Sequence, residues 1–345
     1  MSFYRAREDL REWLEQSKRR KAFKKLEKEI VSSGVCTECG ACVEICPVDA
    51  ITGIRSDEKY TPTLTGECIA CGLCYAICPR TLLFREDLLG NYIEAWKAQS
   101  LSEREGQNGG VVSSLLRHLL KVGDVDRAIC GTSQQDKPWK PRAVSIRNPE
   151  DVPTGTIYSH APVIGEVLCE LKKGTTKLAV TGTSCAIDSL VSFDHSPANL
   201  EYSDITVLRL GLFCMESFTY NGMKKFLEDA GIEIDTVEKM EISKGKFRAY
   251  LGHDIREWPV ADLDSTTASS CQYCTDLTCI NADISFGNIG SDDLLTTVLV
   301  RTPRGKRLFD AAIEDSVIKA EVLTDKELLS IERIAMLKAT RCYTQ

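Results

Sequence analysis

Half of the chain's cysteines fall in one short segment, and this clustering restricts the possible folds more than any other feature. The chain has 345 residues and 16 cysteines, and eight of these lie between Cys36 and Cys78. A disulfide framework spreads its cysteines more evenly, and the charged segment Met1–Gly34 lacks the apolar core and cleavage site of a secretory signal. We therefore expect a reducing, cytoplasmic compartment, in which grouped thiolates bind metal.

The clustered cysteines form an internal repeat with the pattern C-x2-C-x2-C-x3-C-P. The first copy begins at Cys36 and the second begins 32 residues later at Cys68. Three thiolates on a tight loop bind three irons of one [4Fe–4S] cluster, and the fourth cysteine reaches the other cluster, so the two ligand sets should cross. Structural zinc, the alternative, normally uses paired C-x2-C knuckles. Cluster one is expected to take Cys36, Cys39, Cys42 and Cys78, and cluster two Cys68, Cys71, Cys74 and Cys46.

The segment from about residue 31 to 85 thus resembles the bacterial-type ferredoxin with two [4Fe–4S] clusters. The segment before it is basic, because residues 1–30 hold ten Lys or Arg and six Asp or Glu, whereas the whole chain carries a net charge of −7. Apolar residues such as Phe23, Leu26 and Ile30 recur at helical spacing and predict a helix over residues 3–30. This helix either packs on its own domain or docks onto an acidic partner or a complex at a membrane surface.

Composition excludes two other classes of protein. No stretch approaches the 18 consecutive apolar residues that a membrane span needs, so we expect a protein that is at most peripheral on the cytoplasmic side of a membrane. The acidic net charge argues against nucleic acid as the main partner.

Strand-like and helix-like segments alternate from about Asn91 onward, which predicts an α/β fold with a mixed sheet. The expected domains are the basic helix (1–30), an α+β ferredoxin domain (31–85), and the first (90–175) and second (176–345) parts of an α/β region. The clearest predicted strands are Ala128–Cys130, Arg142–Arg147, Leu178–Thr181, Ile205–Phe213 and Thr296–Val300, and the clearest predicted helices are Val111–Lys121, Phe218–Asp229, Arg304–Ile313 and Asp325–Leu337.

A second group of cysteines lies in this α/β region. Cys271 and Cys274 form a C-x2-C pair, and Cys185 and Cys214 each follow a predicted strand, at the sheet edge where α/β folds build sites. These four residues are the predicted ligands of a third cluster. Cys279 is also placed where it could be a ligand. The alternative is buried free cysteines, which is the expectation for Cys130 and Cys169, and Cys342 has no predicted role.

Five short motifs occur in the order found in the coenzyme F420-reducing hydrogenase beta subunit and its relatives, and residues 95–340 resemble these proteins. Among them, the fused ferredoxin domain is most similar to the electron-input subunit of reduced-F420 dehydrogenase complexes. Ser184 and Ala186 depart from the family, which usually has proline and glutamine around the first ligand cysteine. The motifs are Gly109-Gly110-Val111-Val112, Gly182-Thr183-Ser184-Cys185, Gly211-Leu212-Phe213-Cys214-Met215-Glu216-Ser217-Phe218, Cys271-x2-Cys274-x-Asp276 and Ala282-Asp283-Ile284-Ser285-x-Gly287-x-x-Gly290.

The resemblance implies an oxidoreductase that binds FAD, one [4Fe–4S] cluster in the α/β region, and the deazaflavin coenzyme F420 as substrate. The hypothesis is that hydride from reduced F420 passes to FAD, and single electrons then pass through three [4Fe–4S] clusters to a protein acceptor. That acceptor is a methanophenazine- or quinone-linked membrane dehydrogenase complex, or ferredoxin. The alternatives are a flavin-free polyferredoxin-like relay, or an F420-linked component of a formate dehydrogenase, hydrogenase, sulfite reductase or heterodisulfide reductase.

We name no catalytic residue, because the chemistry belongs to the cofactors, and His160 and the other three histidines are expected to be structural or exposed. Gly109 and Gly110 open a helix, where free N–H groups suit a pyrophosphate, although they form no G-x-G-x-x-G fingerprint. Lys244 and Lys246 either neutralise acidic groups of FAD or F420 or belong to a solvated hairpin. The other predicted cofactor-binding residues are Asn108, Tyr158, Ser159, Gly182, Thr183, Ser184, Asp283, Gly287, Gly290, Arg301 and Thr302.

Overall fold

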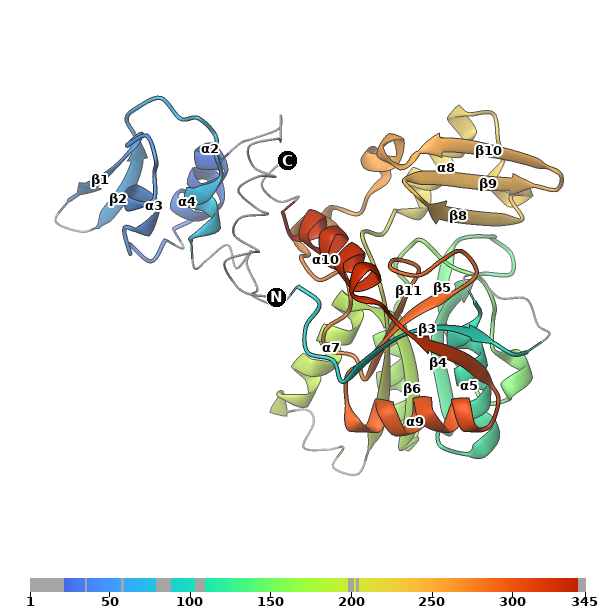
Figure 1. Ribbon diagram of the computed structural model, residues 1–345. Coiled ribbons are helices and arrows are strands. Elements are labelled where there is room, and N and C mark those ends of the chain that lie inside the picture. Colours follow the sequence, from blue (N-terminus) through green and yellow to red (C-terminus); the bar gives the residue numbers. More distant parts are fainter. Residues whose placement is uncertain are drawn as a thin grey trace. The chain divides into compact units, whose positions relative to one another are not determined.

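The structure is a computed structural model that describes residues 22–34, 36–56, 59–78, 88–102, 109–197, 202 and 205–340. The chain divides into two compact units (Figure 1). The N-terminal unit contains residues 1–88 and 336–345, and the α/β unit contains residues 89–335. Residues 1–21 of the predicted basic helix, Asn108 and Cys342 lie outside the described residues.

The N-terminal unit consists of short elements around its two cysteine repeats. A helical segment made of α2 (Ala22–Leu26) and the π-helical turn η1 (Glu27–Val31) buries Phe23, Leu26 and Ile30. These side chains pack with Ile51, Tyr75 and several of the repeat cysteines, so residues 22–31 belong to the core of this unit. The remaining elements are α3 (Ala41–Glu44), α4 (Leu73–Ala76) and the antiparallel hairpin of β1 (Ile51–Arg55) and β2 (Tyr60–Leu64).

The α/β unit is built on one mixed sheet of eight strands with the order β13-β3-β12-β11-β7-β6-β4-β5. Strands β4, β6, β7 and β11 are parallel, and the strands at both sides of this group are antiparallel. The strands are β3 (Glu94–Ser100), β4 (Arg127–Ser133), β5 (Pro141–Ile146), β6 (Lys177–Thr183), β7 (Thr206–Leu212), β11 (Ile284–Gly287), β12 (Thr296–Val300) and β13 (Ile318–Val322). The predicted α/β class with a mixed sheet is confirmed.

Helices cover both faces of the large sheet, because the central strands are apolar on both sides. Ala128 and Ala179 face a core shared with α5 (Val111–Val122) and α9 (Pro303–Glu314), whereas Ile129, Leu178 and Val180 face α6 (Val163–Lys172) and α7 (Ser184–Asp194). This alternation has the period of two that a strand requires. The last helix, α10 (Asp325–Thr340), begins in the α/β unit.

A smaller sheet lies between β7 and β11 in the sequence. It contains β8 (Lys239–Ser243), β9 (Lys246–Leu251) and β10 (Asp254–Pro259), and it packs with α8 (Tyr220–Asp229) around Phe247 and Leu263 (Figure 1). Short helical turns η4 (Ile234–Thr236), η5 (Val260–Thr266) and η6 (Ser269–Tyr273) flank it, and η2 (Pro149–Asp151) precedes α6. The sequence of residues 237–251 predicts a β-like stretch, which contains β8 and β9, whereas no sequence pattern predicts β10.

The boundary predicted at residues 175 and 176 falls inside the large sheet. Strands β3, β4 and β5 come from before it, and β6 and the later strands come from after it. The two predicted parts therefore form a single structural unit. Among the described residues, no helix is both long enough and apolar enough to cross a membrane.

Candidate functional site: two groups of cysteines

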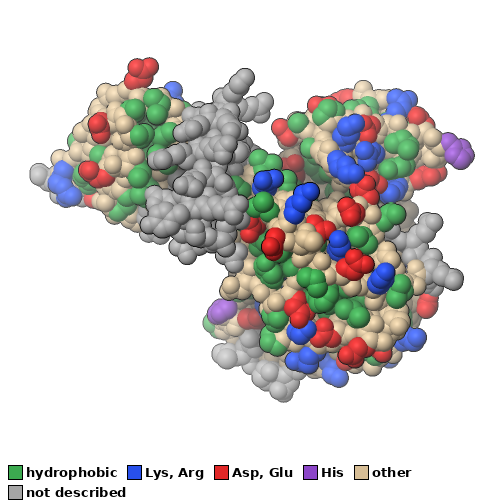
Figure 2. All heavy atoms as spheres, viewed as in Figure 1, with side chains coloured by type: hydrophobic (Ala, Val, Ile, Leu, Met, Phe, Trp, Pro, Cys, Tyr) green, Lys and Arg blue, Asp and Glu red, His purple; other side chains and the backbone are tan. Residues whose placement is uncertain are grey.

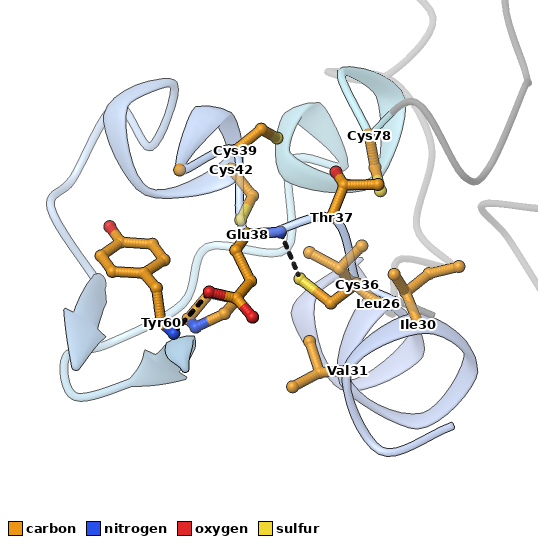
Figure 3. A pocket seen from close by; sticks show the side chains of 12 residues that line it. Leu26, Ile30, Val31, Cys36, Thr37, Glu38, Cys39, Cys42, Tyr60 and Cys78 are labelled. Atoms are coloured by element: carbon orange, nitrogen blue, oxygen red, sulfur yellow. Dashed lines mark hydrogen bonds between the residues drawn. The ribbon is translucent and has the colours of Figure 1, made fainter. Parts of the chain in front are cut away.

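Four cysteines of the N-terminal unit line one pocket. Cys36, Cys39 and Cys42 come from the first repeat and Cys78 comes from the second, so the structure brings together the crossed set predicted for cluster one. Figure 3 shows these side chains around a common space, with Leu26 and Ile30 on its apolar side. The sulfur donors and the apolar lining both fit an iron–sulfur cluster.

The two repeats have the same local backbone geometry. Glu38 and Ala70 occupy equivalent positions with φ of 58° and 55°, and their N–H groups donate to the sulfurs of Cys36 and Cys68 at 3.4 and 3.3 Å. Gly40 and Gly72 follow with φ of 74° and 84° and begin α3 and α4. The left-handed residues turn each loop around its cysteines, so that N–H groups point at sulfur.

Cys68 and Cys71 lie close enough to Cys74 to affect its titration, and Cys46 packs against the same buried cluster. Burial and these neighbouring thiols raise the pKa of Cys74 to about 12, and the same causes raise the pKa of Cys42 to about 11. Crowded, half-buried thiolates repel one another unless a cation lies among them. The donor sets therefore fit bound iron, which reverses this effect and keeps each thiol deprotonated.

A second group of cysteines lies at one edge of the large sheet. Cys185 is in the first turn of α7, directly after β6, and Cys214 follows β7. β6 and β7 are parallel neighbours, paired from Lys177 with Thr206 to Thr183 with Leu212. Both cysteines follow the carboxyl ends of these strands and therefore lie at the same edge of the sheet. Cys271 and Cys274 lie in and just after η6.

Shared neighbours connect these cysteines. His160 lies with its Nε2 atom 3.8 Å from the sulfur of Cys271, and Cys185 is its other cysteine neighbour. Ser217 donates its N–H to the sulfur of Cys271 at 3.3 Å, and its hydroxyl lies 4.0 Å from the sulfur of Cys214. The imidazole of His160 lowers the pKa of Cys185 to about 7, and the two thiols raise the pKa of His160 to about 10.

Asp276 holds the Cys274 loop against α7. Its carbonyl oxygen accepts from the Ser184 hydroxyl at 3.0 Å and lies 3.7 Å from the sulfur of Cys274. Its carboxylate accepts the backbone N–H groups of residues 278, 279 and 280 at 2.9 to 3.0 Å, which fixes the next turn. Shared neighbours thus connect all four cysteines predicted for the third cluster.

The remaining described cysteines lie elsewhere. Cys279 is fully buried in the core between the sheet and α6 and α7, where it packs on Gly211, and burial raises its pKa well above the usual value. Cys130 is buried as predicted, but Cys169 is exposed, because it lies on the outer face of α6. Among the described residues, no three Cys, His, Asp or Glu side chains converge as tightly as the ligands of one metal ion. A four-iron cluster holds its cysteines farther apart than a single ion does.

The predicted cofactor-binding glycine turns lie at the same sheet edge as the cysteines. Gly109 and Gly110 precede α5, and Gly109 contacts the start of β12, where an added Cβ would lie 2.9 Å from the Thr296 hydroxyl. Gly182 and Thr183 end β6. Gly287 ends β11 against the ring of Phe213, and Gly290 packs on α10, so both of these glycines are needed for packing within the chain. The hydroxyl of Ser184 is buried and bonded to Asp276.

Three predicted residues lie at the opposite edge. Asp283 is buried and accepts the Arg209 N–H at 2.9 Å and the Thr302 hydroxyl at 2.7 Å, and Thr302 also caps α9. Arg301 is buried and donates to Ser285, to the carbonyls of Leu89 and Asn91, and twice to Thr278, at 2.7 to 3.0 Å. These bonds occupy all five N–H groups of the guanidinium, which leaves none for a phosphate.

The predicted residues near the small sheet make contacts within the protein. The hydroxyl of Tyr158 accepts the N–H of Ile242 at 2.9 Å, and the neighbouring Ser159 is half-buried. Lys246 is exposed and paired with Glu257, and Lys244 pairs with Asp293 at 2.7 Å. Figure 2 shows basic and acidic side chains side by side on this lobe. Its face is therefore a solvated network of ion pairs rather than an unbalanced basic patch.

The two cysteine-rich sites define an iron–sulfur protein of the electron-transfer class. Residues 24–83 match the 4Fe-4S dicluster domain. Residues 92–167 match the N-terminal part, and residues 175–326 the C-terminal part, of the family described as coenzyme F420 hydrogenase/dehydrogenase, beta subunit. No sequence signal other than its position near predicted sites distinguished His160, and Ser217 was part of a motif without an assigned role.

Several known proteins are similar to this chain over most of its length. The coenzyme F420-dependent sulfite reductase of Methanocaldococcus jannaschii is 32% identical over 330 residues, which are 91% of this chain but 50% of that protein. A subunit of the F420H2 dehydrogenase of Methanosarcina mazei is 30% identical over 87% of this chain and 89% of its own length. A chain of the F420-reducing [NiFe] hydrogenase complex from Methanosarcina barkeri superposes with a TM-score of 0.70 at 28% identity, covering 75% of this chain and 92% of that chain.

The chain belongs to the family of coenzyme F420 hydrogenase/dehydrogenase beta subunits. The predicted family and oxidoreductase class are thereby confirmed, as is the N-terminal ferredoxin-like domain. The match to that domain begins at residue 24, which agrees with the packing of α2 and η1 into the N-terminal unit.

Proposed function

We propose that this chain oxidises reduced coenzyme F420 and passes the electrons through FAD and three [4Fe–4S] clusters to a protein partner. The observation that carries the proposal is that the Gly109-Gly110 turn and the four-cysteine site share one sheet edge. A hydride acceptor and a one-electron carrier must lie near each other for this reaction. The three relatives described above are named as an F420-dependent sulfite reductase, an F420H2 dehydrogenase subunit and a chain of an F420-reducing hydrogenase complex, and these names support F420 as the substrate.

The residues at this edge fit the phosphates of FAD. Gly110 has φ of 67° and begins α5, whose first N–H groups have no partner within the helix and lie at its positive end. A second helix, α7, begins after Gly182 and Thr183 at the same edge. Position 109 requires glycine, because an added Cβ would lie 3.0 Å from the carbonyl oxygen of Leu294. We assign the pyrophosphate to these backbone groups, by the attraction of helix N-termini for anions.

The four cysteines Cys185, Cys214, Cys271 and Cys274 would hold the third cluster. When bound, FAD accepts the two electrons of a hydride together and releases them one at a time, which lets a deazaflavin reduce iron–sulfur clusters. The chain itself orients and shields. Ser217 and Asp276 fix the cysteine loops, and the burial of Cys271, which is 6% exposed, keeps water from one side of the site.

The two cysteine repeats support a protein partner as the electron acceptor. A ferredoxin-type unit fused to the flavin region supplies an exit for single electrons toward another protein. We place that partner in a membrane dehydrogenase complex to which this chain binds as a peripheral cytoplasmic arm, with soluble ferredoxin as the other acceptor. The relative named as part of an F420H2 dehydrogenase supports the first of these.

A flavin-free relay between other proteins is the competing function. It would need only the cysteine-bearing N-terminal unit, whereas residues 89–335 form a separate folded unit around an eight-stranded sheet. The two functions differ in one simple measurement, the FAD content of protein purified without oxygen.

The test combines cofactor analysis with one pair of variants. We expect about one FAD and about twelve irons per chain. Cys274→Ala should lose up to about four irons and leave the spectrum of the two ferredoxin clusters unchanged. Cys169→Ala is the matched control, because Cys169 is exposed on α6 and should keep the full iron content. Iron without FAD would overturn the flavin proposal, and full iron in Cys274→Ala would overturn the ligand assignment.

A further inference from the structure

His160 is the one histidine among the described residues that contacts the four-cysteine site. It lies in the segment before α6, two residues ahead of Pro162. Backbone bonds hold this segment on both sides. The carbonyl of Tyr158 accepts the N–H of Phe218 at 2.8 Å, and the carbonyl of Ala161 accepts the N–H of Val163 at 2.8 Å. The imidazole is therefore presented to the site by a fixed backbone.

The His160 ring connects two loops that are far apart in sequence. Its Nε2 atom lies 3.8 Å from the sulfur of Cys271 in η6, and Cys185 in the first turn of α7 is its other cysteine neighbour. Cys271 further accepts the Ser217 N–H at 3.3 Å. One imidazole thus bonds one predicted cluster ligand and lies next to a second.

The cysteines of the N-terminal unit have a different environment. The N–H···S bonds described there come from the backbone, from Glu38 to Cys36, Ala50 to Cys46 and Ala70 to Cys68. Hydrogen bonds to cluster sulfurs stabilise the more negative, reduced state of a cluster and so raise its reduction potential. A side-chain donor at the α/β unit therefore makes its cluster easier to reduce than backbone donors alone would.

We propose that His160 is a positioning residue that donates its Nε2–H to the Cys271 sulfur of the third cluster, orders the Cys185 and Cys271 loops, and raises the reduction potential of that cluster. The inference rests on the proposed function, since it requires a cluster bound by these cysteines. It adds a residue that acts on the cluster through its ligands and does not itself touch the substrate.

The experiment compares His160→Leu with His160→Gln, using a redox titration followed by electron paramagnetic resonance of the anaerobically purified, full-length protein. Leucine removes the donor, whereas the glutamine amide can place an N–H near the position of Nε2. We expect about a tenfold lower equilibrium constant for reduction of the third cluster in His160→Leu, a shift of about −59 mV for one electron. Glutamine should restore most of the shift.

His195→Leu is the matched control, because His195 is exposed at the end of α7 and bonds the Val191 carbonyl at 2.7 Å. Its third cluster should have the wild-type potential. Loss of the third cluster in His160→Leu with retention in His160→Gln would also support the proposal. An unchanged potential in His160→Leu, or loss of the cluster in both variants, would overturn it. Wild-type protein with about eight irons would overturn the proposed function as well, so the two failures are distinguishable.

Discussion

Arg301 provides a test of which predicted cofactor residues are structural. Its guanidinium makes five hydrogen bonds that join β12 to Leu89, Asn91 and the Thr278 turn, up to 212 residues away in the sequence. In Arg301→Lys the charge remains, but an ammonium has three donors and no planar fork, so at least two acceptors lose their partner.

The expected cost follows from those lost bonds. A buried acceptor left without a donor costs about 1–3 kcal/mol, so two of them give about 2–6 kcal/mol. For a unit of this size, 1 kcal/mol corresponds to about 2–4 °C, so Arg301→Lys should lower the melting temperature of the α/β unit by roughly 4–24 °C. FAD content at temperatures well below melting should stay at the wild-type level.

The assay is thermal unfolding of the anaerobic holoprotein together with the FAD content of the folded fraction. Arg142→Lys is the control, because Arg142 makes one described bond, from Nε to the Ser133 carbonyl at 3.2 Å, and its side chain is exposed. Wild-type melting combined with loss of FAD in Arg301→Lys would refute the structural role and restore Arg301 as a flavin residue.

Two further predictions concern the N-terminal unit and α10. Because the ligand sets cross, Cys78→Ala should disturb the cluster bound by the first repeat, and Cys46→Ala should disturb the cluster bound by the second repeat. Paramagnetic resonance of each variant checks this. Disturbance of the cluster bound by the variant's own repeat would contradict the crossed assignment. Glu327 accepts the Thr324 N–H at 2.7 Å in a capping box and pairs with Lys97, and these contacts lower its pKa from 4.5 to about 2. Glu327→Gln should therefore destabilise the α/β unit by about 1 kcal/mol above pH 4.5. The difference should vanish as the pH falls toward 2, and a difference that persists there in chemical denaturation would count against the carboxylate.

The sequence predicts those parts of the fold that have strong local signals. Strand β12 has the predicted bounds Thr296–Val300, and all five of its residues are buried. The cysteine repeat predicts which four cysteine side chains line the pocket in Figure 3. The missed strands carry weak patterns. β10 is almost entirely exposed, and β3 and β13 alternate charged and apolar residues imperfectly.

In the candidate site, sequence patterns also fail to predict the role of side chains whose partners are distant in the sequence. Arg301 after a strand has the pattern of a phosphate-binding residue, but the carbonyls that it satisfies belong to segments which the sequence does not connect to it. His160 has no motif around it, and its importance comes from a backbone that places it between Cys185 and Cys271. Cys169 was predicted to be buried because its helix is apolar, and only the packing of α6 decides which face is exposed.

The most direct test of the account is rapid anaerobic mixing of the purified chain with reduced coenzyme F420, following flavin absorbance and then the paramagnetic signals of quenched samples. We predict that F420 is oxidised, that the flavin is reduced first, and that the clusters of the same chain are reduced after it. Reduction of the clusters by NADH and not by reduced F420, or no reaction with reduced F420 in protein that contains FAD and about twelve irons, would contradict it.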